Sequence, residues 1–137
     1  MKFLKALVPA LALVATVSHA SDILDHKQAV RDTTKVRQVN YTCATGGRLT
    51  VKYGFNEQSQ PTYAEAVVGG KNRFMPINLA RSDVSGTFFG QEDSYTLGVD
   101  ALTLGNYHRV GLASIQDPAS EIMHKDCRVV SINKIKG

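Results

Sequence analysis

The chain has 137 residues, of which 43% are hydrophobic and 20% are charged, with 16 Lys and Arg against 12 Asp and Glu. This length suffices for one domain with its own hydrophobic core and leaves no room for a second. The basic residues are scattered along the sequence, which argues against a dedicated surface for nucleic acid or another polyanion.

The first 20 residues have the features of a secretory signal peptide. Lys2 and Lys5 form a basic start, an apolar run extends from Ala6 to Val17, and Ser18-His19-Ala20 is a small-x-small cleavage site. The run is too short to span a bilayer as a retained helix, and the absence of a cysteine at the site excludes the lipoprotein route. Cleavage there leaves 117 residues with 14 basic and 12 acidic side chains, and we expect this product to act outside the cytoplasm.

The chain contains two cysteines, Cys43 and Cys127, which bracket nearly all of its strand-like sequence. In an exported protein this pair predicts one structural disulfide. By the loop-length relation such a bridge stabilises the fold by roughly 4 to 5 kcal/mol. A redox role would require closely spaced cysteines with a lowered thiol pKa, and nothing in the sequence indicates one.

The elements predicted in chain order are almost all strands. Residues 21–37 are polar and lack sustained alternation, so they are interpreted as a loose lead-in, in which residues 25–30 are compatible with a short helix. Apolar residues then alternate with polar ones over 39–43 and again over 49–55, on either side of a Thr-Gly-Gly turn. The predicted β domain spans residues 38–137.

The same pattern continues downstream. Two alternating segments, 62–68 and 71–77, flank Gly69-Gly70 and predict a second hairpin, in which Pro76 ends the second strand or lies at an edge. Seven or eight short strands with glycine turns and no long helix indicate an all-β fold, a small antiparallel barrel or sandwich. The remaining candidate strands are residues 88–89, 95–99, 107–115 and 122–128.

The sequence has no pattern typical of a metal or catalytic site. His26, His108 and His124 lie far apart without zinc-ligand spacing, and there is no Gly-x-Ser-x-Gly motif. Glu92 and Asp93 are adjacent, so on an extended chain they point to opposite faces and are interpreted as a solvated turn. We therefore expect no metal, no cofactor and no enzymatic activity. The least favoured alternative, a small periplasmic enzyme, would require titratable side chains converging in a pocket.

Two loop segments are candidates for a binding site. In the first, Ser85 and Gly86 can form a protruding loop anchored by Phe89, although a strand start with a bulge at the glycine explains the same residues. In the second, a glycine turn presents an aromatic ring, an imidazole and a cation in succession. Taken alone, each segment is interpreted more readily as structure than as a site. The second segment consists of Gly105, Asn106, Tyr107, His108 and Arg109.

Seven short segments spread over residues 39–127 together carry a resemblance to a known family. The chain resembles the bacterial periplasmic and membrane-associated inhibitors of C-type lysozyme, a fold group that includes the adhesin complex proteins. The segments are Val39-Asn40-Tyr41-Thr42-Cys43, Val51-Lys52-Tyr53-Gly54-Phe55-Asn56, Thr62-Tyr63-Ala64, Met75-Pro76-Ile77-Asn78-Leu79, Phe88-Phe89-Gly90, Tyr95-Thr96-Leu97-Gly98 and Lys125-Asp126-Cys127.

The resemblance implies an antiparallel eight-stranded barrel closed by one disulfide, and inhibition of host C-type lysozyme by loops inserted into its active-site cleft. A Ser-Gly-x-x-Tyr motif places a serine loop in that cleft, and here Ser85 and Gly86 match it, with Phe89 in the position of the tyrosine. A second family motif has Thr-Lys-Gly after a tyrosine. Here Tyr95 is followed by Thr96-Leu97-Gly98, which lacks the lysine.

The missing lysine raises the question of which cation would enter the cleft. Lysozyme has two carboxylates beside its bound sugar, so an inhibitor gains by placing hydrogen-bond donors and a positive charge between them. Arg109 is the favoured cation because a guanidinium can hold a carboxylate through two parallel hydrogen bonds. Lys71 and Arg81 are weaker candidates.

A second hypothesis is a surface adhesin, in which the barrel is a rigid platform for loops that bind host cells. The two functions are compatible. One observation distinguishes the two hypotheses: an adhesin without inhibitory function binds cells and leaves lysozyme turnover unchanged. An unpaired strand edge would in addition support a homodimer.

Overall fold

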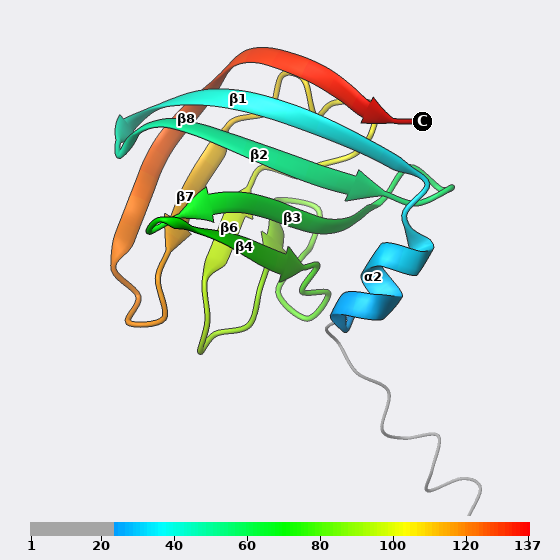
Figure 1. The fold of residues 1–137 in the computed structure, drawn as a ribbon, viewed down its shortest axis with the longest axis horizontal. Helices are drawn as coiled ribbons and strands as arrows, with labels where there is room; N and C mark the ends of the chain where they lie inside the picture. The colour runs from blue at the N-terminus through cyan, green and yellow to red at the C-terminus, as the bar shows by residue number, and fades with distance from the viewer. Residues whose placement is uncertain (1–23) are drawn as a thin grey trace, which may run out of the picture.

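The computed structural model describes residues 24–137, and eight antiparallel strands form one sheet that curves into a nearly closed barrel (Figure 1). Neighbouring strands follow the order β4-β3-β2-β1-β8-β7-β6-β5. The predicted signal peptide and its cleavage site lie outside the described residues. The strands are β1 (Lys35–Thr45), β2 (Gly47–Phe55), β3 (Pro61–Val68), β4 (Lys71–Pro76), β5 (Thr87–Phe89), β6 (Thr96–Val99), β7 (Leu112–Gln116) and β8 (Ile122–Lys136).

The barrel closes at two places. The first and last strands, β1 and β8, pair over most of their length, and the predicted disulfide joins them at Cys43 and Cys127, which are direct cross-strand partners. At the other seam the chain after β4 meets β5. There the Asn78 N–H donates to the Phe88 carbonyl at 2.8 Å, and the Gly90 N–H donates to the Pro76 carbonyl at 2.8 Å. The predicted all-β barrel with one disulfide is thus confirmed.

The glycine turns lie where the sequence predicted them. Gly46 and Gly47 connect β1 to β2 with φ angles of 92° and 73°, and Gly69 and Gly70 connect β3 to β4 with φ angles of 61° and 80°. Side chains other than glycine rarely adopt these angles. Both predicted hairpins are therefore confirmed, and Pro76 ends β4 as expected.

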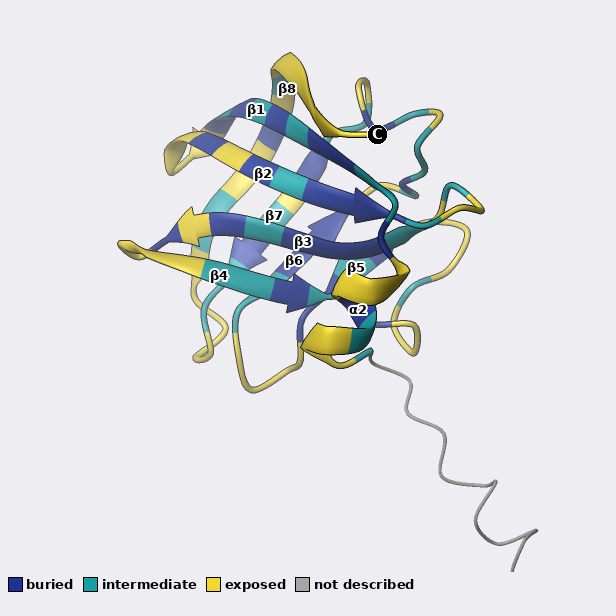
Figure 2. Ribbon diagram, turned by 45° about the vertical axis from the view of Figure 1, so that its right-hand side comes forward, coloured by how far each residue is buried: buried dark blue, intermediate teal, exposed yellow. Residues whose placement is uncertain are grey.

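The core fills the barrel with alternate residues of the strands, as the dark stretches in Figure 2 show. Inside it, the hydroxyl groups of Tyr41 and Tyr53 form a hydrogen bond of 2.7 Å. This bond satisfies two polar groups that would otherwise be buried without partners. The largest fully buried side chains are Tyr41, Tyr53, Phe55, Phe89, Met75, Leu97, Leu112, Ile115, Val39, Val51 and Val68.

The segment before β1 is more ordered than a loose lead-in. Helix α2 (His26–Asp32) begins after Asp25, whose carboxylate accepts a hydrogen bond from the Gln28 N–H at 2.7 Å. The helix packs on β3 and β4, and the His26 ring stacks on Phe74 with 3.9 Å between centroids. Over residues 24–137, no helix has the length and apolar character that crossing a membrane requires.

Two strands extend well beyond their predicted boundaries. β1 begins at Lys35, inside the expected lead-in, because Arg37 is buried and disguises the alternating pattern. β8 continues to Lys136, well beyond the predicted end at residue 128. Its register with β1 shifts twice, which leaves Val130 and Ile135 as extra residues and interrupts the period of two.

The strand predicted over 107–115 is also shorter than expected, since β7 begins only at Leu112. Residues 104–109 form turns instead. Their backbone is organised by Asn106, whose side chain bonds to the Ala101 carbonyl and the Thr103 N–H, each at 2.8 Å. Such local bonds compete with strand pairing.

Candidate functional site

Long loops gather at one end of the barrel. We call this the loop end, and the opposite end, which has the β1–β2, β3–β4, β5–β6 and β7–β8 connections, the turn end. Antiparallel strand order places alternate connections at opposite ends, so the two loop segments predicted as binding sites share one end. The loop end consists of residues 56–60, 77–86 and 100–111.

The first predicted loop is a preformed hairpin held by one carboxylate. Asp83 accepts hydrogen bonds from the Ser85 hydroxyl at 2.7 Å, the Ser85 N–H at 2.9 Å and the Gly86 N–H at 3.1 Å. The Asp83 N–H in turn donates to the Gly86 carbonyl at 2.9 Å. Hydrogen bonds from the Ser85 hydroxyl and then its N–H lower the pKa of Asp83. Val84 is 96% exposed, so it projects from the tip beside Ser85.

The second predicted loop divides into buried and exposed residues. Tyr107 is buried and packs against Phe55, with 5.9 Å between ring centroids, and Asn106 is occupied in holding the loop. His108 and Arg109 are exposed. Tyr107 and Asn106 therefore have structural roles. The side chains of His108 and Arg109 are available to a partner.

An apolar groove of about 460 Å³ lies between the two loops. Leu79, 54% exposed, contributes to its wall. The loop over 100–111 is fixed beside it by hydrogen bonds from the Leu102 N–H to the Thr87 hydroxyl at 3.0 Å and from the Leu104 N–H to the Ser59 carbonyl at 3.1 Å. The groove is lined by Gln60, Pro61, Ile77, Leu79, Ser82, Asp83, Val84, Thr87, Ala101, Leu102 and Thr103.

Other predicted site residues lie elsewhere. Phe89 is fully buried in the core, where its ring centroid is 5.8 Å from that of Tyr53. Tyr95 lies at the turn end, where the Arg73 guanidinium is 4.1 Å from its ring centroid and 3.3 Å from its hydroxyl. Neither side chain joins Ser85 at the loop end.

The two weaker candidate cations, Lys71 and Arg81, lie at opposite ends of the barrel. Lys71 follows the β3–β4 turn at the turn end, whereas Arg81 lies in the loop before the hairpin, with its guanidinium 4.8 Å from the centroid of the Phe88 ring. The long loops of the loop end thus carry two arginines, Arg81 and Arg109.

Sequence reasoning missed the apolar part of this surface. Leu79 and Val84 give no periodic signal because they stand in loops, and an isolated apolar residue in a loop has no sequence signature. Asp83, by contrast, does have a sequence signature. An aspartate two residues before a serine is typical of an Asx turn, in which the carboxylate accepts backbone N–H groups ahead of it.

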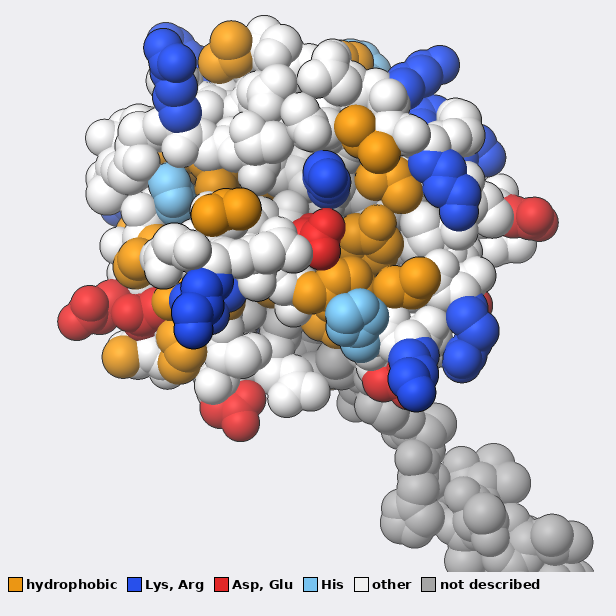
Figure 3. Space-filling model, in the orientation of Figure 1, with side chains coloured by type: hydrophobic (Ala, Val, Ile, Leu, Met, Phe, Trp, Pro, Cys, Tyr) orange, Lys and Arg blue, Asp and Glu red, His pale blue; other side chains and the backbone are white. Residues whose placement is uncertain are grey.

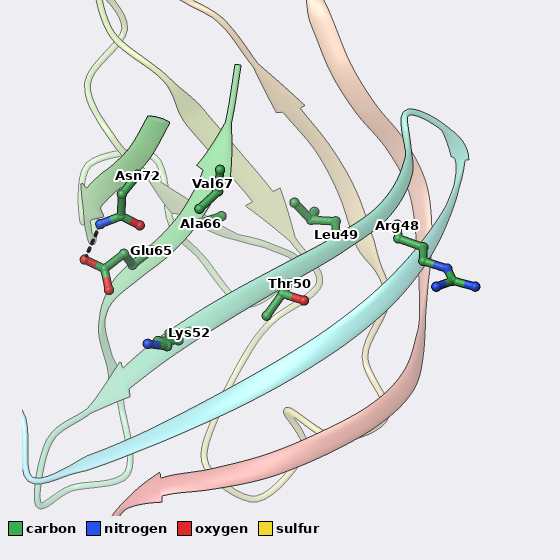
Figure 4. Close-up of a pocket in the computed structure, with 8 residues that line it drawn as sticks. All are labelled: Arg48, Leu49, Thr50, Lys52, Glu65, Ala66, Val67 and Asn72. Atoms are coloured by element: carbon green, nitrogen blue, oxygen red, sulfur yellow. Dashed lines mark hydrogen bonds between the residues drawn. The ribbon is translucent and has the colours of Figure 1, made fainter. Parts of the chain in front are cut away.

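A second hollow, of about 310 Å³, lies on the outer wall of β2, β3 and β4 (Figure 4). It is lined by Arg48 and Lys52 together with Glu65, which accepts a hydrogen bond from Asn72 at 2.8 Å. None of the predicted site residues lines it. On the face seen in Figure 3, Lys and Arg side chains are spread apart and acidic ones lie among them.

No group of three or more His, Cys, Asp or Glu side chains within residues 24–137 is arranged to hold a metal ion. The described part of the chain therefore provides no candidate metal centre. What the loop end offers is a shaped surface, made of a projecting hairpin, an apolar groove and two arginines.

Comparisons with known proteins agree with this architecture. Residues 37–129 match the family described as ACP-like domain. A solved structure, the Adhesin Complex Protein from Neisseria meningitidis, is 41% identical to the chain with a TM-score of 0.63, and the match covers 68% of this chain and 98% of that one. No curated protein matches significantly. The resemblance to adhesin complex proteins is confirmed, and the chain belongs to the ACP-like domain family.

Proposed function

We propose that the chain is an exported bacterial binding protein that uses its loop end to contact host molecules. The carrying observation is the Asp83–Gly86 hairpin, which projects with Val84 and Ser85 at its tip beside an apolar groove. A hairpin already held in shape loses little conformational entropy on binding. Exposed apolar side chains beside a groove are typical of protein-binding surfaces.

The first part of the proposal is an adhesin role. The printed name of the solved relative, Adhesin Complex Protein, supports it. We propose a host cell surface as the partner and the outer-membrane surface or periplasm as the location. A signal peptide at residues 1–20, ahead of helix α2 and of a barrel that begins at Lys35, belongs to this proposal.

The second, finer part is inhibition of host C-type lysozyme. The enzyme's cleft is flanked by two carboxylates, so a hairpin entering it with Asp83 at its base meets electrostatic repulsion. Positive charge beside the hairpin must offset that repulsion. Arg109 and Arg81 are the arginines of the adjoining loops, and Ser85 supplies a hydroxyl at the tip. We propose that Arg109 bonds a cleft carboxylate while Ser85 and Val84 exclude water from it.

The test is a titration of cell-wall lysis by C-type lysozyme with the purified, disulfide-bonded protein, run beside a host-cell binding assay. Stoichiometric loss of lysis supports inhibition, whereas cell binding with undiminished lysis leaves only the adhesin role. Arg109→Ala should weaken inhibition by about 2 kcal/mol, or about thirtyfold. Lys71→Ala, at the turn end, is the matched control and should leave inhibition unchanged.

A further inference from the structure

Within residues 24–137, the second half of β8 has a strand partner on one side only. From Ile122 to Cys127 it pairs with β7, whose first paired residue, Leu112, lies opposite Cys127. From residue 128 to Lys136 the strand pairs with β1 alone. Figure 1 shows this half, in red, beside β1 as it approaches the C-terminus, and Figure 2 shows it as exposed along most of its length. Its outer backbone edge is therefore open.

This open edge is held firmly in strand conformation. The buried Arg37, 5% exposed, donates from Nη1 to the Lys136 carbonyl at 2.8 Å and from Nη2 to the Gly137 carbonyl at 2.9 Å. The Asn40 side chain donates to the Ser131 hydroxyl at 2.9 Å. These bonds pin the strand to β1 up to its last residue. An incoming strand would meet an ordered template.

The side chains of this edge are apolar and basic. The exposed hydrophobic ones are Val130, Ile132 and Ile135, at 64%, 40% and 49% exposure. Between residues 128 and 137 there are three basic side chains and no acidic one. The basic side chains are Arg128, Lys134 and Lys136.

Charge decides which kind of strand this edge can accept. In antiparallel pairing of two copies through this edge, three cations of one chain lie among three of the other, and like charges facing across strands are destabilising. Lysines and bulges also protect edges against unwanted pairing. Protection alone, however, does not account for three exposed hydrophobic side chains. These cations repel a basic strand and attract an acidic one, so the edge favours an acidic partner.

We propose that residues 128–136 of β8 bind, by strand addition, an extended segment of a partner protein in which acidic and apolar side chains alternate. Backbone hydrogen bonds along the open edge supply binding, and alternate side chains supply specificity. Acidic side chains on one face of the segment pair with Arg128 and Lys136, whose β1 partners Thr42 and Val36 lie on one face of the sheet. Apolar side chains on the other face cover Ile132, which lies opposite Val39. This surface is additional to the loop end and shares no residue with it.

The proposal can be tested with a fluorescently labelled synthetic decapeptide of alternating glutamate and valine. Its binding to the full-length protein is measured by fluorescence anisotropy. The double variant Arg128→Glu/Lys136→Glu should weaken binding by about tenfold or more. The matched control, Lys27→Glu/Lys71→Glu, makes the same change in net charge on exposed residues elsewhere and should leave binding within about twofold. The β8 variant keeps the Arg37 bonds, which end on backbone carbonyls, so its fold is retained.

Two further measurements separate strand addition from simple charge attraction. The peptide should slow amide hydrogen exchange over residues 128–136, and the same peptide with N-methylated backbone amides should bind at least about tenfold more weakly. Equal weakening in both charge variants, undiminished binding of the N-methylated peptide, or no binding below about 1 mM would each overturn the proposal. The proposal would also be overturned if analytical ultracentrifugation showed a homodimer that the β8 variant abolishes. Arg128→Glu alone, at a position paired with Thr42 toward the turn end, should leave lysozyme inhibition and cell binding unchanged.

Discussion

The hydrogen bond between Tyr41 and Tyr53 allows a quantitative test of the core. Both side chains are buried and their hydroxyl oxygens lie 2.7 Å apart. Burial raises the pKa of both phenols, so they stay neutral at ordinary pH and the bond joins two uncharged groups. Tyr53→Phe removes one hydroxyl and leaves that of Tyr41 buried without this partner. The expected loss of unfolding free energy is about 1 to 3 kcal/mol, and Tyr41→Phe should cost about the same.

The double variant distinguishes the hydrogen bond from the general effect of losing two oxygens. With both hydroxyl groups gone, no polar atom of this pair remains unsatisfied, so the double variant should lose less stability than the two single losses combined. We expect a coupling of about 1 kcal/mol in urea unfolding followed by circular dichroism. Losses that add to within about 0.5 kcal/mol would show that the bond contributes nothing.

Three more predictions follow from the structure. Replacing Cys43 and Cys127 by alanine should lower the unfolding free energy by roughly 4 to 5 kcal/mol, and an unchanged urea midpoint would contradict this. Gly90→Ala should lower the thermal unfolding midpoint more than Gly47→Ala. Both positions have a positive φ, but a methyl group at residue 90 overlaps backbone atoms, whereas a methyl group at residue 47 has open space. In an NMR titration, the pKa of Asp83 should lie below the usual value for an aspartate. Its hydrogen bonds therefore stabilise the hairpin at neutral pH, and this stabilisation is lost as the pH falls through the lowered pKa. A titration midpoint at or above the usual pKa would refute the observed geometry.

Much of the fold was predictable because its elements follow local rules. Paired glycines mark two hairpins, and alternation marks the core-facing residues of β1 and β2. The strand ends were less predictable for a physical reason. A buried arginine at residue 37 and bulges at Val130 and Ile135 break the period of two, and only tertiary contacts explain why the strands continue through them.

The candidate site was partly predictable. The sequence indicated the serine hairpin and the exposed Arg109, but it grouped Tyr95 with them, and the strand order places that residue at the turn end. Spatial grouping of loops depends on which strands pair, which short motifs do not encode. Leu79 shows the same limit, because its contribution to the groove arises only when residues 100–111 fold beside it.

The most direct test of the account is an amide hydrogen-exchange footprint of the protein saturated with a host partner, either C-type lysozyme or host-cell membrane fragments. We expect slowed exchange in residues 77–86 and 100–111 and unchanged exchange at the turn end. Protection around Tyr95 or along the outer wall of β2–β4, with the loop end exchanging as in the free protein, would contradict the assignment of the loop end as the binding surface.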